Sequence, residues 1–196
     1  MIYADNAATT KMSERAKKVM LETADSFWEN PSSLHTPGQK AAERLYKVRE
    51  DIAKIIGADP GEIYLTSGGS EADNQALRTA AKIGRRKKKM HIISTAIEHH
   101  AILHTLDALK KEGFEITLVP VDEFGRVSPE DIKNAIKDDT VMVSVMFANN
   151  EIGTIEPIEE IAAVCKEKGV LFHTDAVQAA GHLKIDVKEM QIDMLS

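Results

Sequence analysis

Four polar clusters stand out because each directly follows an apolar run of the sequence. An apolar run that breaks into small or polar residues is typical of a strand that ends in a loop or at the start of a helix. In open α/β sheets, ligands bind beyond the carboxyl ends of the strands. The sequence therefore predicts one site built from these clusters, which are residues 67–70, 98–100, 149–154 and 175–178.

The first cluster has the composition of a phosphate-binding turn. Gly68 and Gly69 let the backbone approach an anion closely, and the free N–H groups of the following helix would stabilise its charge. Ser70 adds a hydroxyl group. An ordinary turn with Ser70 as the helix N-cap is an alternative interpretation of the same residues.

The other clusters carry groups suited to a flat, cationic ring. Asp175 directly follows an apolar run, and a carboxylate removed from water needs a cation or strong donors. A protonated aromatic nitrogen of a phosphorylated cofactor meets that need. His99 could stack on such a ring, while Asn150 and Gln178 offer amide donors to a phenolate oxygen. The competing interpretations are a helix N-cap for Asp175 and a core histidine for His99.

The spacing of apolar residues predicts the elements that position these clusters. After an N-terminal arm, we expect helices over residues 13–26 and 39–57, joined by a loop over residues 29–38. Strands and helices then alternate, which predicts an α/β fold with a mostly parallel sheet and helices on both faces. The predicted strands are 63–66, 91–95, 115–119, 141–148 and 170–173, and the helices between them are 70–83, 100–111, 129–136 and 158–168.

Composition excludes several classes of protein. The chain of 196 residues has a net charge of −6, which argues against nucleic acid or an anionic membrane as its main partner. No apolar stretch reaches the roughly 18 residues of a membrane span, so we expect a cytoplasmic protein. The basic run at residues 85–89 is interpreted as a solvated loop.

Cysteine and histidine patterns predict no metal site. The single cysteine, Cys165, lies among the apolar positions of a predicted helix and is interpreted as a buried small apolar residue rather than a nucleophile. His100 and His104 are one helical turn apart but lack a third ligand.

Six motifs together resemble the NifS/IscS-type cysteine desulfurases, which are pyridoxal-phosphate enzymes of the class V aminotransferase group. They are Tyr3 to Thr10, Asn30 to His35, Thr66 to Asn74, Glu98 with His99, Asn149 to Gly153 and His173 to Gln178. The motifs keep the family order from Tyr3 to Ser196. The resemblance implies that residues 1–14 are an N-terminal arm and part of a small domain. It also implies that residues 15–196 are the pyridoxal-phosphate-binding large domain of fold type I, incomplete at its C-terminal end.

The resemblance also implies roles for individual residues. Gly69 and Ser70 would hold the cofactor phosphate, where the family more often has Ala and Thr. His99 would stack on the pyridine ring and move protons, and is therefore the catalytic candidate. Asp175 would pair with the ring nitrogen.

Two amide side chains, Asn150 and Gln178, would bond to the phenolic oxygen of the ring. The family activity takes sulfur from L-cysteine, leaving alanine and an enzyme persulfide for iron–sulfur cluster or thio-cofactor synthesis. A sulfur-acceptor scaffold protein is the implied partner, and a homodimer is the implied assembly.

The sequence departs from the family pattern at its C-terminal end, Ser196. The family carries a lysine that attaches to the cofactor shortly after the position of Ser196, and much later a nucleophilic cysteine. Because neither is present, we expect the chain to be inactive alone and to associate with itself or with a missing half. It would be a fragment, one half of a split enzyme, or a non-catalytic remnant that binds a partner or a phosphorylated ligand. The alternative enzyme is another class V member, such as a selenocysteine lyase or an aminotransferase.

Overall fold

The computed structural model describes residues 2–196, which form two compact units. Residues 2–64 make up the first unit and Leu65–Ser196 the second. The domain boundary expected between residues 14 and 15 stays a prediction.

The first unit consists of two helices and a short 3-10 turn. They are α1 (Glu14–Ser26), α2 (Thr36–Ile56) and η1 (Pro60–Glu62). Helix α2 begins three residues earlier than predicted because His35 caps it, with Nδ1 accepting from the Gly38 amide at 3.2 Å. Pro37 fits this first turn, where a missing N–H group has no effect. Gly57 ends the helix in the left-handed conformation, as predicted.

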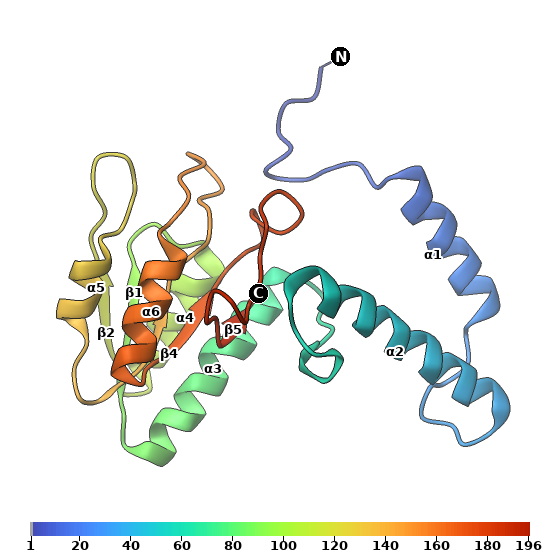
Figure 1. The fold of residues 1–196 in the computed structure, drawn as a ribbon, viewed down its shortest axis with the longest axis horizontal. Helices are drawn as coiled ribbons and strands as arrows, with labels where there is room; N and C mark the ends of the chain where they lie inside the picture. Colours follow the sequence, from blue (N-terminus) through green and yellow to red (C-terminus); the bar gives the residue numbers. More distant parts are fainter. Residues whose placement is uncertain (1) are drawn as a thin grey trace. The chain divides into compact units, whose positions relative to one another are not determined.

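The second unit is a parallel sheet with helices on both faces (Figure 1), which confirms the predicted fold class. The strand order is β2-β1-β3-β4-β5, and every neighbouring pair is parallel. The elements are α3 (Gly69–Lys87), β1 (His91–Thr95), α4 (His100–Lys111), β2 (Glu115–Val119), α5 (Pro129–Ala135), β3 (Thr140–Ser144), α6 (Ile158–Lys168), β4 (Leu171–Thr174) and β5 (Met194–Leu195).

Two apolar clusters hold the helices to the two faces of this sheet. Successive strand residues point to opposite faces, so Ile92 packs with α3 and α4 while Ile93 packs with α5 and α6. Both isoleucines are completely buried, as is Phe172 of β4 on the second face. Cys165 lies in the same cluster as Phe172, and burial raises the pKa of its thiol to about 12. The interpretation of Cys165 as a buried apolar residue is confirmed.

One predicted strand is wrong. Residues 63–66 pair with no strand of the described chain, although Ile63 has extended dihedral angles. A strand requires a hydrogen-bonded neighbour, which an apolar run alone does not guarantee. The reverse error concerns β5, whose two residues are too few for a sequence pattern and pair with His173 and Thr174 through tertiary context.

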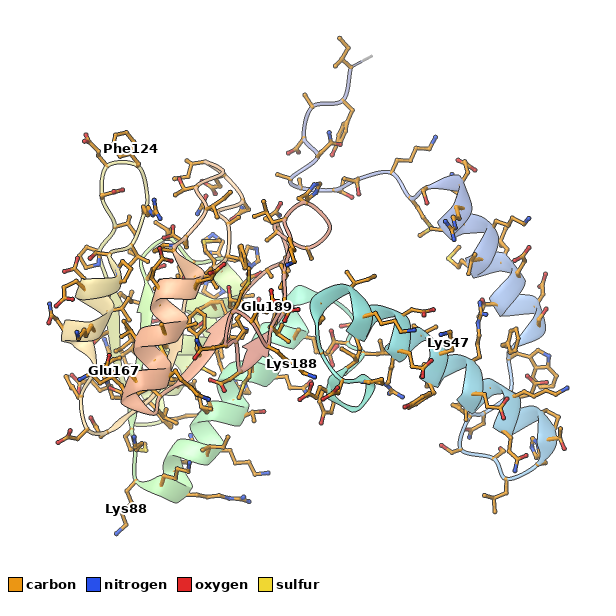
Figure 2. All side chains as sticks on the ribbon, in the orientation of Figure 1. Lys47, Lys88, Phe124, Glu167, Lys188 and Glu189 are labelled. Carbon is orange, nitrogen blue, oxygen red and sulfur yellow. The ribbon has the colours of Figure 1, made fainter. Side chains whose placement is uncertain are left out.

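The basic run also differs from the prediction. The last turn of α3, rather than a loop, contains Arg85, Arg86 and Lys87. Their positive charges interact favourably there with the negative end of the helix dipole. Figure 2 shows Lys88, just after α3, at one end of the sheet and Phe124, in the loop after β2, at the other. Residues that come after the strands thus lie at the end opposite to the basic run. Within residues 2–196, no helix has the length and apolar character needed to cross a membrane.

Burial predicts which aromatic residue stabilises the second unit. Phe172→Ala removes a completely buried ring and is expected to lower the free energy of unfolding by about 3 to 5 kcal/mol. Phe124→Ala, at a side chain that is 71% exposed, is the control and should change it by less than about 0.5 kcal/mol. Urea unfolding measures both, and equal effects would contradict the described core.

Candidate functional site

Helix α3 begins at Gly69, with Gly68 rather than Ser70 as its N-cap. Gly68 adopts φ 157° and ψ 178°, a conformation that is essentially restricted to glycine. The first amides of the helix, those of Gly69 and Ser70, have no intrahelical acceptor. The carboxylate of Glu71 bonds to the amide and hydroxyl groups of Ser67, both at 2.6 Å, and the hydroxyl bond chiefly lowers its pKa. The turn thus keeps the one acid of the first turn engaged with Ser67.

Gly69 brings this helix start against the loop that follows β4. A Cβ atom at position 69 would lie 2.7 Å from Cγ2 of Val177, closer than side chains approach one another. Val177 is two residues after Asp175, so the first and fourth polar clusters are neighbours in space. The absence of a side chain at Gly69 is what permits this approach.

Asp175 is buried at the end of β4, with 6% of its surface exposed. Its Oδ1 accepts from the Val177 amide at 3.0 Å, and its carbonyl oxygen accepts from the Phe147 amide at 2.8 Å. A turn rather than a helix follows Asp175, so the N-cap interpretation is wrong. Burial raises the pKa of the carboxyl group, while the Val177 amide and the charge of His99 lower it.

A second buried acid lies behind this edge. Asp73, on the buried side of α3, is 1% exposed, and its Oδ1 lies 3.9 Å from Nε2 of His173. His173 also meets the hydroxyl groups of Ser144 at 2.9 Å and Ser196 at 3.0 Å. Burial, followed by the charge of Asp175, raises the pKa of Asp73 to about 7, and burial lowers that of His173 to about 4. His173 is thus neutral at pH 7, and its contact with Asp73 is not an ion pair there.

His99 caps helix α4 and is exposed. Its Nδ1 accepts from the Ala101 amide at 3.2 Å, which leaves the other ring nitrogen free to carry the proton. The interpretation of His99 as a core histidine is therefore wrong. The preceding residue, Glu98, is buried instead and bonds to the hydroxyl group of Thr95 and the amide of Met146.

The amide side chains after β3 and β4 divide into two kinds. Asn149 is buried and structural: its amide group donates to the Ile97 carbonyl at 3.1 Å, and its Oδ1 accepts from the Glu151 and Ile152 amides. Asn150 and Gln178 are half-buried at the ends of β3 and β4. The structure therefore gathers Gly69, His99 and Asp175 beyond the carboxyl ends of the strands, with Asn150 and Gln178 on the loops there, although no strand precedes the first cluster.

Sequence reasoning gave no role to Asp73, Glu98 or His173, although Glu98 lies in the second polar cluster. An acid on the apolar stripe of a helix, four residues before the completely buried Leu77, was the signal available for Asp73. His100 and His104 stack with ring centroids 5.4 Å apart. Among residues 2–196, no three metal-binding side chains come together.

Comparison with known proteins identifies the family of this chain. The model of the aminotransferase class-V family matches residues 2–196, nearly the whole chain. The chain belongs to the class V aminotransferase family. Members of this family depend on pyridoxal phosphate.

Similar class V proteins include cysteine desulfurases. The chain is 56% identical over 195 residues to cysteine desulfurase IscS of Clostridium botulinum (strain Kyoto / Type A2), and 49% identical to cysteine desulfurase IscS of Methanosarcina thermophila. Each alignment covers 100% of this chain, but 49% and 48% of those proteins. The chain spans about half the length of the curated relatives it matches.

Solved structures of this family share the fold. SspA in complex with cysteine superposes with a TM-score of 0.94 at 37% identity, over 99% of this chain and 56% of that one. A NifS-like protein gives 0.93 at 38% identity, over 97% of this chain and 53% of that one.

The contact between Gly69 and Val177 predicts that the effect of Gly69→Ala on stability depends on the side chain at position 177. Gly69→Ala should destabilise the protein by about 1 kcal/mol because its Cβ overlaps Val177. In a Val177→Ala background, the same substitution should be neutral or stabilise by about 0.5 kcal/mol, because alanine restricts the unfolded chain. Urea unfolding of the four proteins measures the difference. Equal effects of Gly69→Ala in both backgrounds would contradict the close approach.

Burial of Asp73 predicts a pH dependence of stability. Its pKa rises from 3.8 to about 7 on folding, so the proton on Asp73 stabilises the fold below about pH 4, and this stabilisation is lost as pH rises towards 7. Asp73→Asn removes the loss, and its stability relative to wild type should increase between pH 4 and pH 8 by on the order of 2 to 4 kcal/mol. Denaturant unfolding at each pH measures this, and a difference that stays constant with pH would contradict it.

Proposed function

We propose that this chain binds pyridoxal phosphate at the carboxyl edge of its sheet, as part of a cysteine desulfurase. The observation that carries the proposal is the buried carboxyl group of Asp175 beside the N-terminus of α3, joined to it by the contact between Gly69 and Val177. The phosphate group of the cofactor requires an anion-binding site, and its protonated ring nitrogen requires an acid.

The phosphate group fits the N-terminus of α3. The amides of Gly69 and Ser70 point out of the helix start, and the helix dipole favours a negative charge there. The hydroxyl group of Ser70 is exposed at the same turn. Glu71 is held to Ser67 by two hydrogen bonds, which keeps its carboxylate engaged away from these amides.

The ring nitrogen fits Asp175. Pyridoxal phosphate, when bound with a protonated ring nitrogen, withdraws electrons from the substrate carbon. The carboxyl group of Asp175 is buried, and His99 is the only base among the groups that shift its pKa. A cationic ring would supply the missing opposite charge and keep Asp175 ionised.

The remaining residues act around the ring. His99, with one nitrogen engaged by the Ala101 amide, has its other nitrogen available to hold or move a proton. Asn150 and Gln178 are proposed to donate to the phenolic oxygen from the loops after β3 and β4. These assignments rest on family resemblance and on the position of each residue at this edge.

The proposed substrate is L-cysteine, and the proposed partner is a sulfur-acceptor protein. Similar proteins of 49 to 56% identity are cysteine desulfurases, and the similar structure of SspA is in complex with cysteine. In the proposed reaction, a cysteine thiolate that is not among residues 1–196 attacks the sulfur of the substrate to form a persulfide, and the carbon that loses the sulfur takes up a proton to give alanine.

Loss of the Asp175 charge should weaken cofactor binding. Asp175→Asn is expected to reduce the affinity for pyridoxal phosphate about tenfold or more, because a charge-assisted hydrogen bond becomes a neutral one. Equilibrium dialysis monitored by absorbance measures the affinity. Asp186→Asn is the matched control, because Asp186 also accepts backbone amides in a turn of the same unit, and it should leave the affinity unchanged.

Pyridoxal, which lacks the phosphate group, should bind at least about tenfold more weakly than pyridoxal phosphate. Inorganic phosphate should compete with the cofactor. Saturable binding that is equally strong in Asp175→Asn would contradict the assignment of the ring nitrogen. No binding at all would favour the alternative of a non-catalytic remnant.

Desulfurase activity is tested with a fusion of this chain to the part of the Clostridium botulinum relative that lies beyond the match. The expected result is alanine from L-cysteine, measured by chromatography, with a loss of activity in the same fusion carrying Asp175→Asn. A folded, cofactor-loaded fusion that releases no alanine would contradict the proposed activity.

A further inference from the structure

Glu98 joins the loop after β1 to the strand beside it. Its carboxyl group is buried, and one oxygen, Oε1, accepts from the Thr95 hydroxyl group at 2.6 Å and the Met146 amide at 3.0 Å. Thr95 is the last residue of β1, while Met146 follows β3. One side chain thus connects the ends of two neighbouring strands.

A second connection runs the opposite way. Asn149, beyond β3, donates from its side-chain amide to the carbonyl oxygen of Ile97 at 3.1 Å. Residues 97 and 98 are therefore both tied to the segment that follows β3. The next residue along the chain is His99, which begins α4 by accepting from the Ala101 amide.

We propose that Glu98 is a positioning residue for His99. Through its bonds to Thr95 and Met146, it fixes the backbone from which the His99 ring extends, and so holds that ring at the site edge. The role of this ring towards the cofactor rests on the proposed function, whereas the bracing of the loop does not.

The protonation state of the Glu98 carboxyl group follows from its burial. Burial raises the pKa of the carboxyl group to about 8. The bonds to Thr95 and Met146 act in the opposite direction, and the charges of Asp175 and Asp73 add smaller upward contributions. The carboxyl group is therefore mainly protonated at pH 7. Glutamine is a close substitute for a protonated glutamate because it keeps the accepting oxygen and its size.

The amide proton of Ala101 reports the position of His99 directly. In Glu98→Ala, the loop loses its brace, and hydrogen exchange of this amide, measured by NMR without cofactor, should be about five- to tenfold faster, as expected for a weakened helix cap. In Glu98→Gln, the exchange rate should stay within about twofold of wild type. If Glu98→Ala does not fold, Glu98→Asp replaces it with the same expectation, since its carboxyl group is one carbon shorter.

Glu156 offers a matched control within the same unit. It is equally buried, and its Oε2 accepts from the Val127 amide at 2.9 Å, in a different loop. Glu156→Ala should speed exchange of the Val127 amide and leave Ala101 unchanged. Unchanged Ala101 exchange in folded Glu98→Ala or Glu98→Asp, or equal effects of the two alanine variants on Ala101, would overturn the proposal.

Cofactor affinity is a second, separate readout. If pyridoxal phosphate binds, Glu98→Ala should bind it about tenfold more weakly and Glu98→Gln nearly as wild type. The exchange experiment contains no cofactor, so failure of the proposed cofactor site leaves the Ala101 result intact. Faster Ala101 exchange with unchanged affinity would show a brace without a role at the site and would overturn the positioning role.

Discussion

The burial of carboxyl groups where a parallel sheet ends is the constraint on which the candidate site depends. Asp175, Asp73 and Glu98 are all buried there; the charge of Asp175 raises the pKa of both Asp73 and Glu98, and the charge of Asp73 raises that of Glu98. Burial keeps Glu98 mainly protonated at pH 7 and Asp73 about half protonated, whereas the Val177 amide and the charge of His99 lower the pKa of Asp175 against the effect of its burial. The arrangement favours a cation at Asp175, and a protonated ring nitrogen is the proposed one.

The parallel topology explains why these groups meet. Every strand of the second unit runs in the same direction, so the residues after β1, β3 and β4 all lie beyond the carboxyl ends of the strands, on the same side of the sheet's end. Apolar clusters on both faces fix the strands, and polar side chains then connect their ends. The start of α3 packs closely against Val177 because Gly69 has no side chain.

The regular elements of the second unit were predictable because local patterns and tertiary packing agree there. Strand His91–Thr95 and helix His100–Lys111 have the bounds that apolar spacing predicts. The strand predicted at residues 63–66 failed because strand formation depends on a neighbour that the pattern does not reveal. Helix α3 extends past Ile83 to Lys87 because its basic last turn suits the end of the helix dipole.

The site was predictable in part for a similar reason. Residues that directly follow apolar strands, such as His99 and Asp175, are visible in the sequence as polar breaks. Asp73 and His173 lie inside a helix and a strand, so their contact across 3.9 Å depends on packing that no local pattern encodes. The structural role of Asn149, which ties two loops together, likewise emerges only from the contacts of the folded chain.

A crystal structure of the protein with pyridoxal phosphate would show whether the cofactor binds in the proposed orientation. We expect phosphate oxygens within hydrogen-bond distance of the Gly69 and Ser70 amides, and the ring nitrogen beside the carboxyl group of Asp175. A cofactor bound with its phosphate elsewhere, or with its ring nitrogen facing away from Asp175, would rule out this orientation.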